Sequence, residues 1–145
     1  MKEDRRTFIK KTALGTTGIT LGASTLAFSA KSYNSIRGAN DRINMSVIGV
    51  RGQGNGHLRR WAGMAKDDNV FVKTICDVDE NLFQERVRNV AEIQGETPGT
   101  QVDMRKVFDD NEIDAVSIAA PNHWHALAAI WAVQAGKDVY VEKPC

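Results

Sequence analysis

The feature that most constrains this chain is an apolar run over residues 43–48 that ends in a turn with four glycines between residues 49 and 56. A segment with apolar residues at helical spacing follows. An apolar strand that leads through such a turn into a helix lets the backbone approach a phosphate group closely. The free N–H groups at the helix start then face the negative charge. This stretch therefore predicts an α/β fold that binds a dinucleotide through its pyrophosphate.

The rest of the chain alternates strand-like and helix-like segments. The expected strands are residues 43–48, 70–76, 113–120 and 138–141, and the expected helices are residues 57–65, 80–93 and 123–135. Residues 102–108 are compatible with either an extended or a helical piece, and Gly136 is expected to end the last helix. The alternation predicts a Rossmann-type, doubly wound parallel sheet with helices on both faces.

Composition and charge indicate an ordinary globular protein. The net charge of +1 argues against a nucleic-acid-binding surface, which would carry a basic excess. The two cysteines, Cys76 and Cys145, allow one disulfide at most, and neither has a partner at the spacing of zinc ligands. We expect no metal site, and a buried, unreactive Cys76.

Residues 1–30 have the pattern of an export signal. Arg5 and Arg6 precede a stretch of 19 uncharged residues that is too weakly hydrophobic to predict a stable membrane span. The paired arginines indicate the twin-arginine route specifically, with a disordered basic tail or an uncleaved anchor as alternatives. We expect a periplasmic protein exported by the twin-arginine machinery, with a polar linker over residues 31–42 and a folded domain over residues 43–145.

The glycine turn matches the dinucleotide fingerprint imperfectly. The template G-x-G-x-x-G, started at Gly49, puts Arg51 at the second glycine and Gly54 at the third. Gly52 could provide the close approach one residue later. Arg51 could bind phosphate or lie in solvent. The residues expected to bind the cofactor here are Gly49, Arg51, Gly52, Gln53 and Gly54.

Asp77 provides an independent indication. It ends the second expected strand, 23 residues after Gly54, where an acidic side chain can accept hydrogen bonds from the adenosine ribose. Its charge would repel a 2′-phosphate, and no arginine follows in the next three residues, so NAD is expected rather than NADP. The alternative is that Asp77 only caps the next helix.

Further candidates follow the last two expected strands. Pro121, Asn122 and His125 come after one strand, and Glu142 and Lys143 come after the other. The carboxyl ends of parallel strands form the ligand crevice of such sheets. A lysine in that cleft could donate to, or exchange a proton with, a substrate hydroxyl.

Together these motifs resemble the Gfo/Idh/MocA family of NAD(P)-dependent dehydrogenases over residues 43–145. The matching stretches are the glycine turn, residues 76–79, residues 114–125 and residues 135–144. The resemblance implies that Lys143, the lysine of the family's E-K-P motif, assists proton transfer. It also implies that Asn122, His125 and Glu142 lie near the nicotinamide and that the Lys143–Pro144 bond is a candidate for the cis form. Arg51 departs from the family pattern.

The resemblance further implies an exported, NAD-dependent oxidoreductase that acts on a sugar or polyol. The alternatives are an NAD-dependent glycoside hydrolase, which oxidises and then re-reduces its sugar, and a non-catalytic nucleotide-binding fragment. Family members continue with a sheet-rich second domain that binds substrate. We therefore expect this chain to be an amino-terminal fragment that is inactive alone, from a full-length protein that could form homo-oligomers.

Overall fold

The computed structural model describes residues 42–144. The predicted signal over residues 1–30 and almost all of the linker lie outside the described residues. Strands and helices alternate along the described chain: β1 (Ile43–Ile48), α2 (Gln53–Gly63), β2 (Val70–Cys76), η2 (Glu80–Leu82), α3 (Phe83–Gln94), β3 (Gly99–Gln101), α4 (Met104–Asp109), β4 (Ala115–Ile118), α5 (Asn122–Gln134) and β5 (Asp138–Val141).

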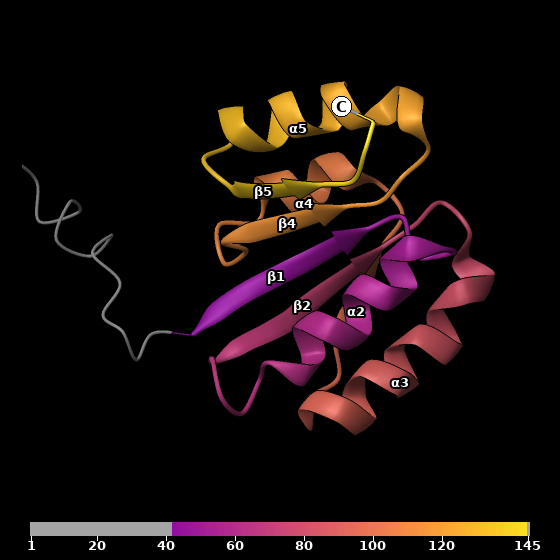
Figure 1. Ribbon diagram of the computed structural model, residues 1–145, viewed down its shortest axis with the longest axis vertical. Coiled ribbons are helices and arrows are strands. Elements are labelled where there is room, and N and C mark those ends of the chain that lie inside the picture. Colours follow the sequence, from indigo (N-terminus) through magenta and orange to yellow (C-terminus); the bar gives the residue numbers. More distant parts are fainter. Residues whose placement is uncertain (1–41, 145) are drawn as a thin grey trace, which may run out of the picture. The chain divides into compact units, whose positions relative to one another are not determined.

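The strands form one parallel sheet in the order β3-β2-β1-β4-β5 (Figure 1). The chain builds the sheet outward from β1 in one direction and then returns to β1 and builds in the other. Ile48 pairs with Cys76 on one side and with Ile118 on the other, so the carboxyl ends of β1, β2 and β4 are level. The predicted Rossmann-type architecture is confirmed.

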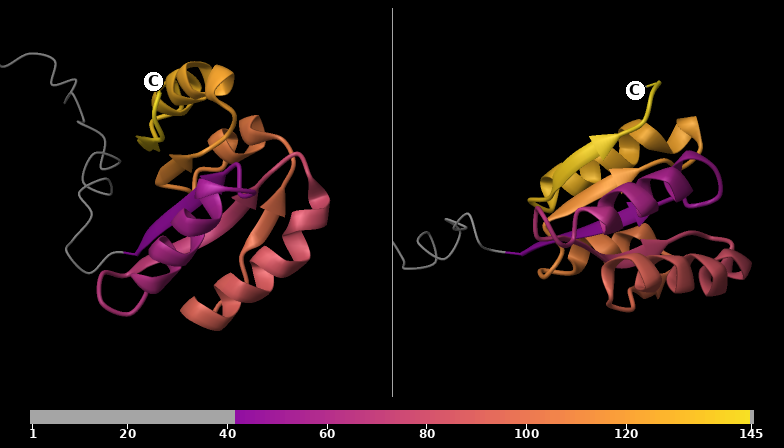
Figure 2. Two further views of the ribbon diagram at one scale, coloured as in Figure 1. Left: turned by 45° about the vertical axis from the view of Figure 1, so that its right-hand side comes forward. Right: turned by 60° about the horizontal axis from the view of Figure 1, so that its bottom comes forward.

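Two apolar layers cover the sheet, with α2 and α3 on one face and α4 and α5 on the other (Figures 1 and 2). Successive residues of a strand point to opposite faces. Val47 therefore packs with Leu58 of α2, whereas Ile48 packs with Val107 of α4. Both faces of β1 are buried, as an apolar strand in the middle of a parallel sheet requires.

The structure corrects the predicted boundaries at the glycine turn. Helix α2 begins at Gln53 rather than at residue 57, so Gly54 and Gly56 belong to the helix. Glycine has a low intrinsic helix propensity, which made this segment look like a turn in sequence. In the structure Gly54 is buried in the helix, directly against the carbonyl of Gly49.

Other predictions needed smaller changes. The expected helix over residues 80–93 is a short 3₁₀ turn, η2, followed by α3. The strand expected over residues 113–120 is limited to Ala115–Ile118, and residues 102–108 contain the helix α4. Strand β3 was missed because its three residues are too few to show a period.

Two backbone predictions are confirmed. Gly136 follows α5 with φ of 76°, and the Lys143–Pro144 bond is cis. Within residues 42–144, no helix is both long and apolar enough to cross a bilayer.

Candidate functional site

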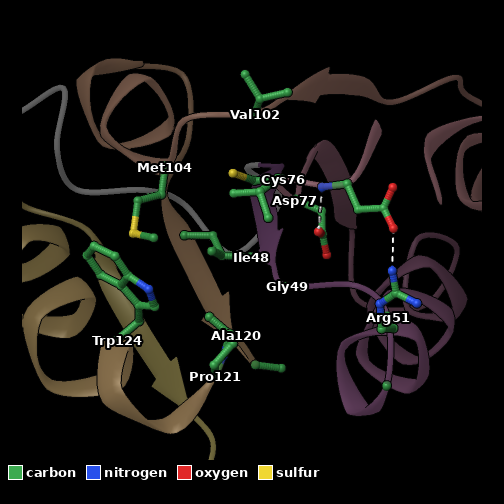
Figure 3. Close-up of a pocket in the computed structure, with 14 residues that line it drawn as sticks. Ile48, Gly49, Arg51, Cys76, Asp77, Val102, Met104, Ala120, Pro121 and Trp124 are labelled. Carbon is green, nitrogen blue, oxygen red and sulfur yellow. Dashed lines mark hydrogen bonds and ion pairs between the residues drawn. The ribbon is translucent and has the colours of Figure 1, made fainter. Parts of the chain in front are cut away.

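Two hollows lie beside the carboxyl ends of β1 and β4, where the direction of sheet building reverses. The larger one, the Asp77 pocket, has a volume of about 450 Å³ (Figure 3). Its lining is mostly apolar and comprises Ile48, Gly49, Arg51, Gly52, Cys76, Asp77, Val78, Asp79, Val102, Met104, Ala119, Ala120, Pro121 and Trp124. Such a reversal point is where open α/β sheets bind their ligands.

The smaller hollow, the Lys143 pocket, has a volume of about 260 Å³ and a more polar lining. It is formed by Gly52, Gln53, Ala119, Ala120, Asn122, His125, Glu142 and Lys143. Gly52, Ala119 and Ala120 line both pockets. The site is therefore a crevice with two compartments that meet at the glycine turn.

The glycines of the turn have different roles. A Cβ on Gly49 would lie 2.6 Å from the amide nitrogen of Ala120, and one on Gly54 would lie 1.8 Å from the carbonyl oxygen of Gly49. These two glycines let the turn pack against itself and against the end of β4. A Cβ on Gly52 would meet no protein atom within 4 Å, so Gly52 faces the space shared by the two pockets.

The start of α2 is suited to an anion. No side chain caps it, and its first turn contains no acidic residue. The partial positive charge at the helix start is therefore not offset by a neighbouring carboxylate of that turn. Together with the open space at Gly52, this arrangement fits a diphosphate that bridges the two compartments.

Asp77 holds the turn in place. Its Oδ2 accepts a hydrogen bond of 2.7 Å from the backbone N–H of Val50, and its Oδ1 accepts one of 3.0 Å from Asp79. The carboxylate thus ties the end of β2 to the turn after β1. Asp79, not Asp77, caps the following 3₁₀ turn, since it accepts from the N–H of Asn81 at 3.2 Å. The predicted ribose contact of Asp77 would use the remaining lone pairs of its oxygens.

Arg51 forms an ion pair with Asp79 at the edge of the Asp77 pocket (Figure 3). The Arg51 side chain is 74% exposed, so the pair is well solvated and contributes about 0–1 kcal/mol. A phosphate could therefore compete for the guanidinium at little cost. The phosphate contact of Arg51 stays a prediction.

The opposite side of the Asp77 pocket is apolar. Met104 and Trp124 lie near each other there, across from Asp77 and Arg51 (Figure 3). Trp124 is 38% exposed and lines the pocket. Cys76 is buried in the pocket floor, and burial, with the nearby Asp77 and Asp103 carboxylates, raises the pKa of its thiol to about 12. The thiol is therefore neutral and unreactive at physiological pH.

His125 connects the E-K-P segment to the end of β4. One ring nitrogen lies 2.7 Å from the carbonyl oxygen of Ala120, and the other lies 2.9 Å from that of Pro144. The ring is almost fully buried, and both of these partners are backbone carbonyl oxygens. The contact of His125 with the cofactor remains a prediction. His125 lines the Lys143 pocket, as such a contact would require.

Backbone pairing also fixes the end of β5. The N–H of Glu142 donates to the carbonyl oxygen of Ile118 at 2.9 Å, which extends the ladder beyond the strand. Asn122, Glu142 and Lys143, which are separate in sequence, meet in one pocket as predicted from the strand ends. Pro121 instead lines the Asp77 pocket.

The sequence reasoning missed His57. This buried histidine of α2 lies with Nδ1 2.9 Å from the hydroxyl of Ser117 and Nε2 2.9 Å from Oε1 of Glu142. In the sequence, the only indication of this residue is that helical spacing places a polar side chain on the face of α2 that packs against the sheet. Across residues 42–144, His, Cys, Asp and Glu side chains form no group of three or more suited to a metal ion.

Comparisons with known proteins agree with this geometry. The model of the Gfo/Idh/MocA oxidoreductase family, described as its NAD-binding Rossmann fold, matches residues 43–145. A glycosyl hydrolase family 109 protein of Shewanella pealeana is 29% identical over 99% of this chain and 34% of its own length. An alpha-N-acetylgalactosaminidase of Shewanella oneidensis is 26% identical over 97% of the chain and 33% of its own length. The chain thus spans about a third of the length of these curated relatives.

Solved structures with the same fold include sugar and inositol dehydrogenases. A levoglucosan dehydrogenase in complex with NADH is 33% identical, with a TM-score of 0.61, over 72% of this chain and 28% of that one. A myo-inositol 2-dehydrogenase from Lactobacillus plantarum is 27% identical, with a TM-score of 0.58, over 72% of this chain and 29% of that one.

Proposed function

Since the chain belongs to the Gfo/Idh/MocA oxidoreductase family, with the matched region being its NAD-binding Rossmann fold, we propose that it is the cofactor-binding part of an oxidoreductase acting on a sugar or polyol. The observation that carries this proposal is the two-compartment crevice. A mostly apolar pocket with Asp77 at its edge joins a polar pocket with Lys143, and Gly52 lies between them.

We propose one orientation for NAD in this crevice. The adenosine would occupy the Asp77 pocket, with the base against its apolar side and the ribose hydroxyls at Asp77. The diphosphate would lie at Gly52 and the uncapped start of α2. The nicotinamide would then enter the Lys143 pocket, where it would supply the hydride acceptor or donor for a carbohydrate carbon.

Lys143 is the residue we assign to proton transfer. It is exposed in the pocket that would hold the nicotinamide, so its Nζ can reach a hydroxyl of a substrate lying on the nicotinamide. It would accept the hydroxyl proton as the alcohol is oxidised, and return it in the reverse reaction.

A second candidate function is glycoside hydrolysis with transient sugar oxidation. The names of two relatives favour it. A glycosyl hydrolase family 109 protein matches 99% of the chain, and an alpha-N-acetylgalactosaminidase matches 97% of it. The two functions share the cofactor site and differ in the fate of the hydride. A dehydrogenase releases NADH, whereas the hydrolase returns the hydride to the sugar and releases an aglycone.

The proposal extends to the site of action. The twin-arginine pattern over residues 1–30 supports export to the periplasm by the route that moves folded proteins. A protein that acquires NAD before export would then reach the periplasm with NAD already bound.

Calorimetric titration of the chain with NAD tests the cofactor site. We expect saturable one-to-one binding, with NADP bound more weakly because Asp77 would face its 2′-phosphate. Gly52→Val should abolish binding, because its side chain would fill the space that the two pockets share.

The matched control is Gly63→Val, at the far end of the same helix, where a Cβ also meets nothing within 4 Å. NAD binding by the Gly52 variant, or no binding by the wild-type chain, would contradict the proposal. Net NADH formation from free sugars, against aglycone release from aryl glycosides, then separates the two candidate reactions in the chain or in any longer protein that contains it.

A further inference from the structure

His57 links the glycine-turn helix to the polar end of the crevice. Its ring lies between two side chains from elsewhere in the fold, Ser117 of β4 and Glu142 after β5, at 2.9 Å from each. Ser117 is fully buried, His57 is 8% exposed, and the side chain of Glu142 is 24% exposed. The contacts therefore run from the interior of the sheet to the lining of the Lys143 pocket.

The chemistry of the three groups fixes the direction of these hydrogen bonds for a neutral ring. A carboxylate can only accept, so Nε2–H of His57 donates to Oε1 of Glu142. Nδ1 then carries no proton and accepts the hydroxyl proton of Ser117. The Tyr140 ring meets the imidazole edge-on, with centroids 5.4 Å apart and planes at 81°. Three separate contacts thus hold the imidazole in one orientation.

His57 lies outside the lining of both pockets, whereas Glu142 lines the Lys143 pocket and directly precedes Lys143. Among the contacts of His57 described above, the one with Glu142 reaches the lining of a pocket. It lies one helical turn after Gln53, the first residue of α2. The same rigid helix that begins at the diphosphate site also holds Glu142 one turn later.

We propose that His57 is a positioning residue, which holds the Glu142 carboxylate against the nicotinamide end of NAD. The inference rests on the proposed function, because it requires NAD in this crevice. A carboxylate beside the positively charged nicotinamide ring attracts it, and the attraction depends on a fixed short distance. Removing His57 would remove the 2.9 Å hydrogen bond to Oε1 that helps to fix the carboxylate at this distance.

The test compares NAD with ADP-ribose, which lacks the nicotinamide. The dissociation constants of both ligands are measured by calorimetry for the chain and for His57→Leu, which removes both hydrogen bonds. We expect ADP-ribose affinity to be unchanged. The preference for NAD over ADP-ribose should fall about tenfold, because the carboxylate would no longer be held close to the nicotinamide charge. His57→Gln, whose amide can still donate to Glu142, should keep most of the preference.

The matched control is Trp61→Phe. Trp61 follows one turn later on α2 and packs edge-on against the same Tyr140 ring, with centroids 6.0 Å apart, but has no hydrogen bond to Glu142. This variant should keep the wild-type preference. If His57→Leu does not fold, as judged by circular dichroism, Ser117→Ala replaces it and should also lower the preference.

The outcomes separate the two proposals. A wild-type chain that binds neither ligand overturns the proposed function. A chain that binds both overturns the role of His57 if NAD has no advantage over ADP-ribose, or if the advantage survives in His57→Leu and Ser117→Ala. If His57→Leu and Trp61→Phe lost the preference for NAD equally, the effect would belong to packing around Tyr140. That result would also overturn the role of His57.

Discussion

At the scale of single residues, the Asp77 carboxylate has structural contacts that the sequence did not reveal. The sequence predicted a carboxylate for a ribose. In the structure, the same carboxylate also accepts hydrogen bonds from the backbone of Val50 and Asp79. The side chain that would select the cofactor therefore also shapes the turn that would hold it.

Replacing Asp77 should affect binding and stability together. We expect Asp77→Ala to weaken NAD binding by about 1–3 kcal/mol and to lower the free energy of unfolding, because two backbone N–H groups lose their acceptor. Asp77→Asn keeps one acceptor oxygen and should lose less of both. Calorimetry with NAD and urea unfolding provide the two measurements.

The control for these variants is Asp67→Ala, in the exposed loop between α2 and β2. It should leave both quantities within about 0.5 kcal/mol of the wild-type values. An Asp77→Ala variant with unchanged NAD affinity would remove Asp77 from the cofactor site.

At the scale of elements, helix α4 shows how a cap can decide what periodicity leaves open. Residues 102–108 contain no clear pattern, but Asp103 accepts a hydrogen bond of 3.0 Å from the N–H of Arg105 and so starts the helix. Its carboxylate also pairs with the Arg105 guanidinium. These bonds, the side-chain one first, lower the pKa of Asp103 from 3.8 to about 2.

The lowered pKa of Asp103 predicts a pH dependence. A carboxyl with a depressed folded-state pKa stabilises the fold above its unfolded pKa, and that contribution is lost as pH falls through the folded pKa. We expect the stability difference between the chain and Asp103→Ala to be constant above about pH 5, and to shrink as pH falls from about 4 to about 2.

Asp103→Asn is the control, because asparagine also caps helices but does not titrate. Unfolding by urea at each pH, followed by circular dichroism, measures the difference. A difference between the chain and Asp103→Ala that stays the same down to pH 2 would contradict the assignment.

At the scale of the whole described domain, one sheet supports two cores. The α2 and α3 side contains Leu58, and the α4 and α5 side contains Ile113, each with at most 2% of its surface exposed. Strand β1 contributes Val47 to one core and Ile48 to the other, so neither core can be lost without exposing β1.

Both cores should therefore unfold in one transition. We expect Leu58→Ala and Ile113→Ala each to lower the free energy of unfolding by about 2–5 kcal/mol, because each leaves a cavity in a packed layer. Tryptophan fluorescence and circular dichroism should give coincident urea curves for both variants. Val78→Ala, at a residue that is 86% exposed, is the control and should change little. Two separated transitions would show that the cores are independent.

The sequence by itself determined the order of the longer strands and helices, the parallel sheet, and the polar residues at the strand ends. These features follow from local patterns: β-branched runs, helical spacing, and glycines where the backbone turns. Asp77, Asn122, Glu142 and Lys143 could be proposed as site residues because a strand end is visible in sequence, and the carboxyl ends of parallel strands share one edge.

Only the tertiary structure decided which partners these residues have. Gly54 lies within a helix, with the carbonyl of Gly49 where a Cβ would be. Asp79 rather than Asp77 caps the next turn, and His57 meets Ser117 and Glu142. His57 and Glu142 are 85 residues apart in the chain, and no local pattern records a contact over that separation. Such contacts depend on strand order, which places β4 next to β1, where it contacts α2, and β5 next to β4.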